Sequence, residues 1–136
     1  MLTGSCLCGT VAFEISAPFV NAGWCHCSRC QKRTGSSASA SGGVASGTFA
    51  IVRGQESVRE WAPPEGFVKA FCTDCGGHLY ARGPEGFDRL AVRLGAIDGD
   101  PGIRPQWHQF TASAAGWDPL PDDGLPRYPG RRPDAG

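Results

Sequence analysis

Apolar and polar residues alternate over several short stretches of the chain, and these stretches predict β-strands. In residues 10–15, Val11, Phe13 and Ile15 fall on one face, because successive side chains of a strand point to opposite sides. Residues 89–94 repeat the pattern, with every second residue apolar. By the same criterion, further strands are expected at residues 49–53, 57–61, 67–71, 79–82 and 106–112.

The predicted strands suggest two hairpins. Residues 49–53 and 57–61 flank a short turn at 54–56, and residues 67–71 and 79–82 flank a turn that contains Cys72 and Cys75. The second hairpin has the usual form of a zinc knuckle, in which a tight turn between two strands supplies two ligands.

Only one short segment has the pattern of a helix. Residues 28–34 are predicted to form one or two helical turns that end at Gly35. Residues 21–23 are expected to be a turn, and residues 35–48 are rich in glycine and serine. This second segment is expected to be either a flexible loop or a place where the backbone closely approaches a ligand.

Length and composition predict a mainly β fold. The chain has 136 residues, which is typical of one domain, and it contains 20 glycines and 11 prolines, which favour turns and short strands. We therefore expect a small single domain of short antiparallel strands with zinc-binding knuckles, covering residues 1–136. Its proline-rich segment 119–136 should be extended and lie over the surface.

Charge and hydropathy exclude several classes of partner. Basic and acidic residues balance at 13 each, so the chain lacks the basic surface that nucleic acid or an anionic membrane requires. It contains no apolar run long enough to span a membrane and no visible secretory signal, which predicts a cytoplasmic location. The sequence does not determine the oligomeric state.

Seven cysteines are the most informative feature of the composition. They occur in three local groups, C-L-C, C-H-C-S-R-C and C-T-D-C, at positions 6, 8, 25, 27, 30, 72 and 75. An odd number of closely spaced cysteines fits poorly with a set of disulfides. It fits a thiophilic metal well, with zinc as the first choice and an iron–sulfur cluster as the alternative.

Seven ligands divide naturally into a closed site of four and an open site of three. The local triplet Cys25, Cys27 and Cys30 could hold one metal ion, and the pairs Cys6/Cys8 and Cys72/Cys75 could close the other. An exchange of pairs remains open, and His26 could also complete a site. A three-ligand site leaves one coordination position for substrate, so this is where chemistry is expected.

The three cysteine groups, in this order, resemble those of a known family. The chain reads G-S-C-L-C-G-T-V-A-F, then C-H-C-S-R-C-Q-K-R-T-G, then F-C-T-D-C-G-G-H-L-Y, then W-D-P-L-P-D-D-G-L-P-R-Y-P. These motifs are similar to those of the glutathione-dependent formaldehyde-activating enzyme (GFA) family, which includes centromere protein V, and the resemblance extends over about residues 3 to 129.

The resemblance implies a tent-like zinc β-fold with two zinc ions. Cys6, Cys8, Cys72 and Cys75 match the structural ligands, and the triplet at positions 25, 27 and 30 matches the catalytic ligands. It also implies a carbon–sulfur lyase activity, in which glutathione or another small thiol is joined to formaldehyde or a related aldehyde. Non-catalytic alternatives are a zinc-binding scaffold or interaction module, and a thiol or metal sensor.

A substrate thiol is a suitable fourth ligand for zinc held by three thiolates, and the bound thiolate could then attack an aldehyde carbon. His26, His78 and His108 are candidates for handling the proton, with His26 favoured by its position between two proposed ligands. Each could instead be a structural histidine. Three basic residues that follow the triplet, Arg29, Lys32 and Arg33, could bind a substrate carboxylate or simply form a solvated helix face.

Overall fold

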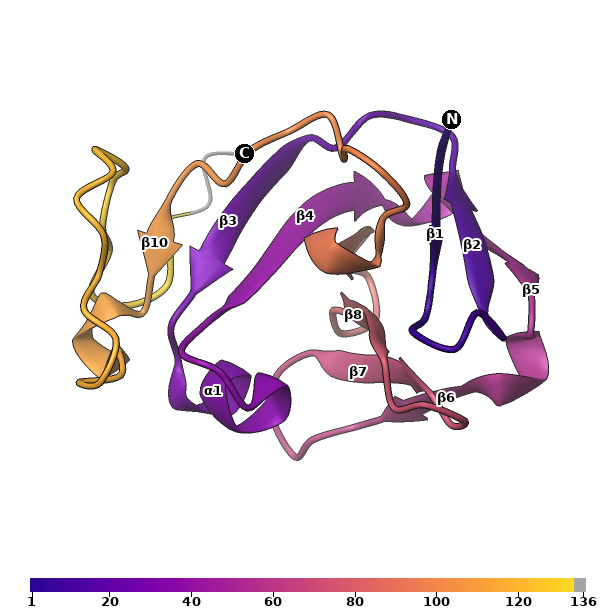
Figure 1. Cartoon of the computed structure of the whole chain (residues 1–136), viewed down its shortest axis with the longest axis horizontal. Coiled ribbons are helices and arrows are strands. Elements are labelled where there is room, and N and C mark those ends of the chain that lie inside the picture. The colour runs from indigo at the N-terminus through magenta and orange to yellow at the C-terminus, as the bar shows by residue number, and fades with distance from the viewer. Residues whose placement is uncertain (134–136) are drawn as a thin grey trace. The chain divides into compact units, whose positions relative to one another are not determined.

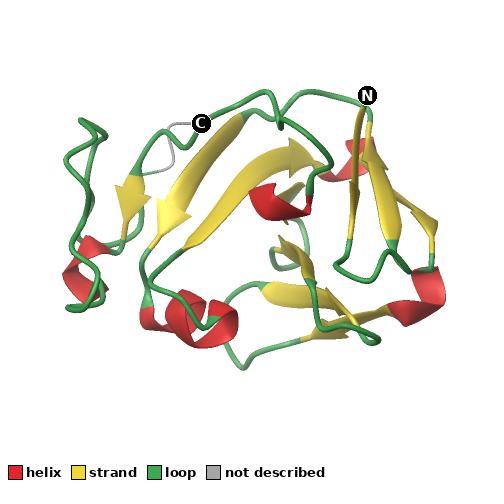
Figure 2. Cartoon of the chain, in the orientation of Figure 1, coloured by secondary structure: helices red, strands yellow, loops and turns green. Residues whose placement is uncertain are grey.

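The computed structural model describes residues 1–133, and these form a mainly β structure (Figure 1, Figure 2). The strands are β1 (Leu2–Ser5), β2 (Ala12–Ile15), β3 (Asn21–Cys25), β4 (Ser39–Ala45), β5 (Phe49–Arg53), β6 (Val58–Trp61), β7 (Val68–Cys72), β8 (His78–Arg82), β9 (Arg89–Arg93) and β10 (His108–Gln109). One α-helix, α1 (Ser28–Thr34), and four short 3-10 turns complete the elements of the described residues. The predicted fold class, a small mainly β domain, is therefore confirmed.

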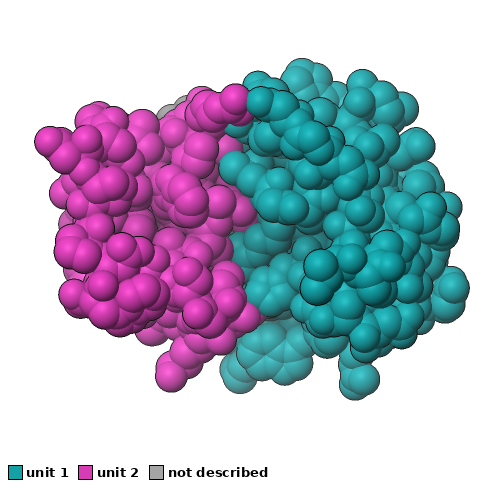
Figure 3. Space-filling view, in the orientation of Figure 1, with its two compact units in different colours: residues 1–21, 42–103 teal, residues 22–41, 104–136 magenta. Residues whose placement is uncertain are grey.

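The chain forms two compact units (Figure 3). Unit 1 consists of Met1–Asn21 and Gly42–Ile103, and unit 2 consists of Ala22–Ser41 and the chain from Arg104 onward. Organisation of residues 1–136 as one domain stays a prediction. No helix among residues 1–133 is long and apolar enough to cross a membrane.

Unit 1 contains the apolar core. Val11, Phe13 and Ile15 are completely buried, as the alternation predicted, and Phe13 stacks on Phe49 with ring centroids 4.9 Å apart. Strands β1, β2 and β5 form one antiparallel sheet, and β9, β8, β7 and β6 pair in that order in the other. Burial of large apolar side chains such as these contributes about 1.5–3 kcal/mol each to folding.

The hairpin expected from residues 49–53 and 57–61 is wrong, although both strands exist. β5 pairs with β2, whereas β6 pairs with β7, so the two strands belong to different sheets. Gly54 adopts a left-handed conformation (φ 76°) and starts a 3-10 turn at Gln55–Ser57, which directs the chain away from β5. The second predicted hairpin, β7–β8 around the Cys72 turn, is confirmed.

The predicted helix of unit 2 is confirmed at both ends. The side chain of Cys27 accepts a hydrogen bond from the backbone N–H of Cys30 and so caps the first turn of α1. Gly35 ends the helix in the left-handed region, at φ 70°, and its N–H donates to the carbonyl of Gln31. These caps hold α1 directly after the strand that carries Cys25.

Two segments predicted to be irregular are strands. Residues 21–23 begin β3 instead of forming a turn, and residues 39–45 of the expected 35–48 loop form β4. The glycines of β4 suggested a loop, but their role is to let the strand backbone pack closely against a neighbouring side chain. A Cβ at Gly42 would lie 2.5 Å from the ring of Phe19. The close backbone approach predicted for this segment is therefore to the side chain of Phe19.

The C-terminal part of unit 2 is extended and follows β10. The strand predicted at residues 106–112 is limited to His108–Gln109, because Phe110 turns into the left-handed region at φ 57°. Backbone hydrogen bonds join His108 to Pro126 and Tyr128, at 2.9 and 2.8 Å. The proline-rich segment is therefore attached to β10 by its backbone, and its last residues, 134–136, lie outside the described part of the chain.

Candidate metal centres

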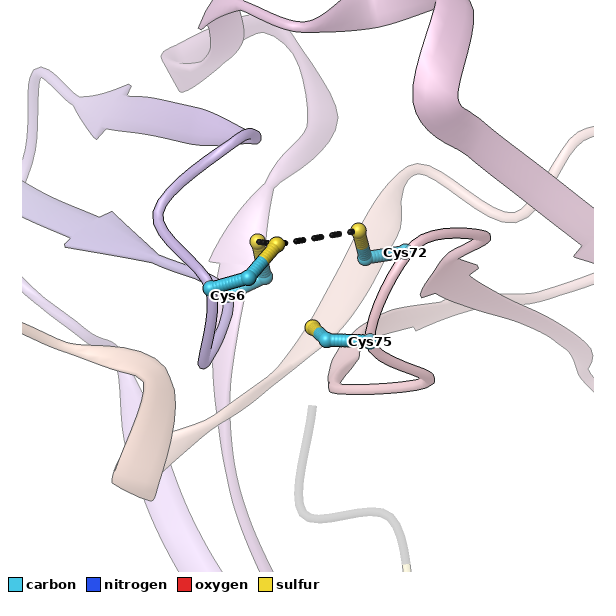
Figure 4. A group of neighbouring side chains, drawn as sticks. Cys6, Cys72 and Cys75 are labelled. Carbon is cyan, nitrogen blue, oxygen red and sulfur yellow. Dashed lines mark hydrogen bonds between the residues drawn. The ribbon is translucent and has the colours of Figure 1, made fainter.

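Four cysteines of unit 1 form one cluster, which we call the four-cysteine cluster: Cys6, Cys8, Cys72 and Cys75. Cys6 and Cys8 lie in the connection between β1 and β2, Cys72 ends β7, and Cys75 lies in the turn that leads to β8. Figure 4 shows the labelled side chains pointing toward one another from these two turns. All four sulfurs lie within 4.8 Å of one another.

The sulfur separations fit a metal ion and exclude disulfides. The Sγ atoms of Cys6 and Cys8 are 3.7 Å apart, and those of Cys8 and Cys72 are 3.9 Å apart. Disulfide sulfurs would be separated by about 2.0 Å. Four sulfurs arranged tetrahedrally at about 2.3 Å from a zinc ion lie about 3.8 Å from one another. The four-cysteine cluster thus has the ligand type, number and spacing of a closed zinc site.

Backbone N–H groups of the two turns point at these sulfurs. Val11 donates to Cys6 at 3.3 Å, and Gly77 donates to Cys75 at 3.4 Å. Hydrogen bonds from the backbone of Cys8 and Gly77 lower the pKa of Cys75 to about 6, whereas burial raises the pKa of Cys72 to about 11. A cation bound at this cluster would favour the thiolate form of Cys72.

Three cysteines of unit 2 form the second cluster, the three-cysteine cluster: Cys25, Cys27 and Cys30. Cys25 ends β3, Cys27 caps α1 and Cys30 lies in the first turn of the helix, so one strand-to-helix junction presents all three. Their sulfurs also lie within 4.8 Å of one another and are half-buried. The hydrogen bond to Cys30, together with burial, raises the pKa of Cys25. A bound cation would reverse this effect.

The two clusters differ in the number of ligands. Among residues 1–133, no further histidine, cysteine or acidic side chain joins the three-cysteine cluster, and His26 is not a member of it. A metal ion held by three thiolates has an open coordination position, which is the arrangement of a catalytic site. The structure thus separates a cluster of four cysteines from a cluster of three, both consistent with metal binding.

His26 is buried beside the three-cysteine cluster and is held at three points. Its N–H donates to the carbonyl of Gln109 at 3.0 Å, and its carbonyl accepts from Nε2 of Gln31 at 2.9 Å. Its ring Nε2 is 2.8 Å from Nδ1 of His108. Burial, followed by the nearby His108, lowers the pKa of His26, which favours the neutral ring.

The hydrogen-bond chain continues to a residue that the sequence did not single out. Nε2 of His108 is 2.7 Å from Oδ2 of Asp123, and the other carboxylate oxygen accepts from the N–H of Leu125 at 3.1 Å. The hydrogen bond with His108 is the main reason that the pKa of Asp123 is lowered. Asp123 lies in a D-D-G-L-P turn, and nothing in that motif indicates which distant side chain it reaches.

The remaining predicted residues are separated by the fold. His78 lies at the start of β8 in unit 1, after the turn of the four-cysteine cluster, whereas His26 and His108 belong to unit 2. Arg29, Lys32 and Arg33 lie on α1, the helix that carries Cys30. The structure thus brings one of the two other candidate histidines, His108, into contact with His26.

Two sheets of short strands and two cysteine clusters that could bind metal define the class, a small mainly β protein with candidate metal sites. Residues 1–113 match the glutathione-dependent formaldehyde-activating enzyme family, so the chain belongs to the GFA family. The family is named for a formaldehyde-activating enzyme.

The fold has a counterpart among solved structures. The crystal structure of a Rhodobacter sphaeroides protein superposes with a TM-score of 0.61 at 20% sequence identity, covering 93% of this chain and 98% of that one. At this identity the likeness concerns the fold alone. No curated protein sequence matches the chain.

Proposed function

We propose that this protein is a zinc-dependent carbon–sulfur lyase of the GFA type, which joins a small thiol such as glutathione to formaldehyde or a related aldehyde. The observation that carries the proposal is the three-cysteine cluster, a thiolate site with one ligand fewer than zinc requires. Family membership supports the reaction class. The four-cysteine cluster would hold a second, structural zinc ion.

Cys25, Cys27 and Cys30 would hold the catalytic ion. Zinc bound by three thiolates supplies one open position, where it lowers the pKa of a substrate thiol. The three thiolates leave the centre with a net negative charge, which makes thiol delivery more suitable than hydrolysis. Their half-buried positions at the start of α1 leave the cluster partly accessible to a small thiol.

The reaction forms one carbon–sulfur bond and opens the carbonyl π bond, and the proton lost by the thiol ends on the former carbonyl oxygen. His26 is the candidate to carry this proton, because it stands between two of the proposed ligands. The hydrogen bond with His108 uses Nε2 of His26, so Nδ1 is the ring atom assigned to this transfer.

Basic side chains on α1 are the candidates for recognising the rest of the thiol. Arg29, Lys32 and Arg33 follow the ligand Cys27 on the same short helix. A carboxylate on the substrate, such as glutathione carries, would pair with guanidinium or ammonium groups at this end of unit 2.

The test uses Cys27→Ser, because serine retains the helix cap while removing the soft ligand. Wild-type protein should bind two zinc ions and accelerate formation of S-hydroxymethylglutathione from glutathione and formaldehyde, followed by NMR. Cys27→Ser should bind one zinc ion and lose this activity, and the neighbouring Ser28→Ala should retain both.

Two outcomes would contradict the proposal. One is undiminished turnover by Cys27→Ser. The other is a wild-type protein that binds two zinc ions but is inactive toward a panel of small thiols and aldehydes, which would favour a scaffold or sensor.

A further inference from the structure

A continuous chain of hydrogen-bonded side chains leads from the C-terminal segment to the three-cysteine cluster. It runs from Asp123 to His108 at 2.7 Å and from His108 to His26 at 2.8 Å, and it ends at the residue between Cys25 and Cys27. The two histidines are almost completely buried, with exposed fractions of 2% for His108 and 7% for His26. The carboxylate of Asp123 is 30% exposed.

Polar groups dominate the interior of unit 2. The buried residues of its described part are Ala22, Gly23, His26, Ser39 and His108, whereas the large apolar core cluster lies entirely in unit 1. Hydrogen bonds therefore contribute much of the order around the three-cysteine cluster. Because a buried polar group without a partner is costly, the two buried histidines depend on the neighbouring members of the chain.

The backbone holds His108 firmly in place. β10 runs parallel to β3, with His108 opposite Trp24 and Gln109 opposite Cys25. The N–H of His108 donates to Pro126, and its carbonyl accepts from Tyr128. Its ring lies parallel to that of Trp24, at an interplanar angle of 10°. His108 is thus fixed on both sides and can transmit the position of the Asp123 carboxylate to His26.

The hydrogen-bond partners of the three groups accommodate a proton arrangement that runs along the whole chain. An ionised carboxylate only accepts hydrogen bonds, so Nε2 of His108 carries the hydrogen that bonds Asp123. With a single ring hydrogen, on Nε2, His108 has a lone pair on Nδ1 that accepts from Nε2–H of His26. This arrangement gives His26 a single tautomer with its hydrogen on Nε2 and fixes the orientation of its ring.

We propose that Asp123 and His108 are positioning residues for the three-cysteine site: by fixing His26, they hold Cys25 and Cys27 in the geometry that binds metal. His26 is anchored by its N–H, its carbonyl and its ring, and its two chain neighbours are proposed ligands. The ring bond is the anchor that depends on Asp123. The inference rests on the part of the proposed function that assigns a metal ion to the three-cysteine cluster.

Asp123→Asn tests this role with a minimal change in shape. An asparagine can donate to Nε2 of His108, which permits the reversed arrangement of hydrogens along the whole chain. The matched control is Asp122→Asn, because Asp122 is the adjacent acidic residue and is also exposed. Both variants lose one negative charge in the same segment.

The first measurement is Co²⁺ binding followed by visible absorption. Wild-type protein and Asp122→Asn should bind two equivalents tightly. In Asp123→Asn the second equivalent should bind about 10–100-fold more weakly, the effect typical of removing an outer partner of a metal site. The first equivalent, in the four-cysteine cluster, should be unaffected.

The second measurement is the ¹⁵N NMR signature of the histidine rings in the zinc-loaded protein, which is simple because the chain has three histidines. His26 and His108 should both be Nε2–H tautomers in the wild-type protein and in Asp122→Asn, and should change in Asp123→Asn. A general loss of structure would not produce a change confined to these two rings.

The outcomes separate this inference from the proposed function. Unchanged tautomers and unchanged Co²⁺ affinity in Asp123→Asn would overturn it, as would equal weakening of both metal sites. If the wild-type protein binds only one equivalent of Co²⁺, the proposed function and this inference both fail. If it binds two equivalents but does not catalyse the addition of thiols to aldehydes, the proposed function fails and this inference is unaffected.

Discussion

At the scale of single residues, Gly23 is important because it leaves room for the ring of Trp107. Gly23 lies in β3, two residues before Cys25, and a Cβ at this position would lie 2.0 Å from the ring of Trp107. The guanidinium of Arg132 also lies over the Trp107 ring, 4.1 Å from its centroid. The indole is a rigid ring in direct contact with position 23, so an added methyl group must displace it.

Gly23→Ala is therefore expected to destabilise the protein by about 1–3 kcal/mol, the usual cost of overpacking. Urea denaturation of the zinc-loaded protein measures this change. The control is Gly116→Ala in the same unit, where a Cβ would meet no atom within 4 Å, and its effect should be below about 0.5 kcal/mol. Equal stabilities of the two variants would show that Trp107 can leave its position.

At the scale of elements, an ion pair connects strands that are not neighbours. β6 and β8 pair with opposite edges of β7, and Arg82 of β8 donates to both carboxylate oxygens of Glu60 in β6, at 3.0–3.1 Å. The hydroxyl of Tyr80 also donates to Glu60, at 3.0 Å. The hydrogen bonds from Arg82, more than those from Tyr80, lower the pKa of Glu60.

This lowered pKa predicts the pH dependence of the pair. A carboxylate whose pKa is lower in the folded state stabilises the fold above its unfolded pKa of about 4.3, and this contribution is lost as pH falls through the folded value. Glu60→Gln should cost at most about 1 kcal/mol at pH 7, because the pair is partly exposed.

The difference between wild-type protein and Glu60→Gln should be constant from about pH 7 to 5 and shrink below about pH 4 in urea denaturation. Exposed Glu56 serves as the control, and Glu56→Gln should show no such dependence. A Glu60→Gln difference that persists at low pH would mean that the carboxylate charge is not responsible.

At the scale of the whole molecule, each cysteine cluster lies within one compact unit. The four-cysteine cluster is in unit 1, where Cys6 and Cys72 also belong to the apolar core. The three-cysteine cluster is in unit 2, on the short helix and the strand before it. Loss of one metal ion should therefore affect one unit more than the other.

Cys72→Ser is expected to unfold unit 1, because a structural zinc contributes on the order of 10 kcal/mol, comparable with the whole stability of a domain. Cys27→Ser should leave unit 1 folded. Hydrogen exchange of β7 and β8 distinguishes the two variants, with protection lost in the first and retained in the second. The division between a structural and a catalytic cluster would be wrong if Cys27→Ser exposed these strands equally.

The structural features that could be predicted from the sequence are mostly those that depend on local patterns of residues. The inward face of β2, the β7–β8 turn and the limits of α1 depend on residues within about ten positions of one another, where alternation, turn chemistry and capping are sufficient. Pairing of β5 and β6 with different sheets was not predictable, because it depends on the left-handed Gly54 and on partners elsewhere in the chain.

The sequence by itself determined the seven thiols and their three local groups, and its motifs predicted membership of the GFA family. The tertiary structure decided which groups meet, because it joins Cys8 to Cys72 across 64 residues of the chain. Only the tertiary structure brought Asp123 to His108 and His108 to His26, contacts that span 15 and 82 residues of the chain. Cysteines on one tight turn are brought together by local geometry, and their spacing in the sequence reveals them. A buried hydrogen-bond chain is assembled by strand pairing and backbone bonds between distant segments, and no local pattern encodes its members.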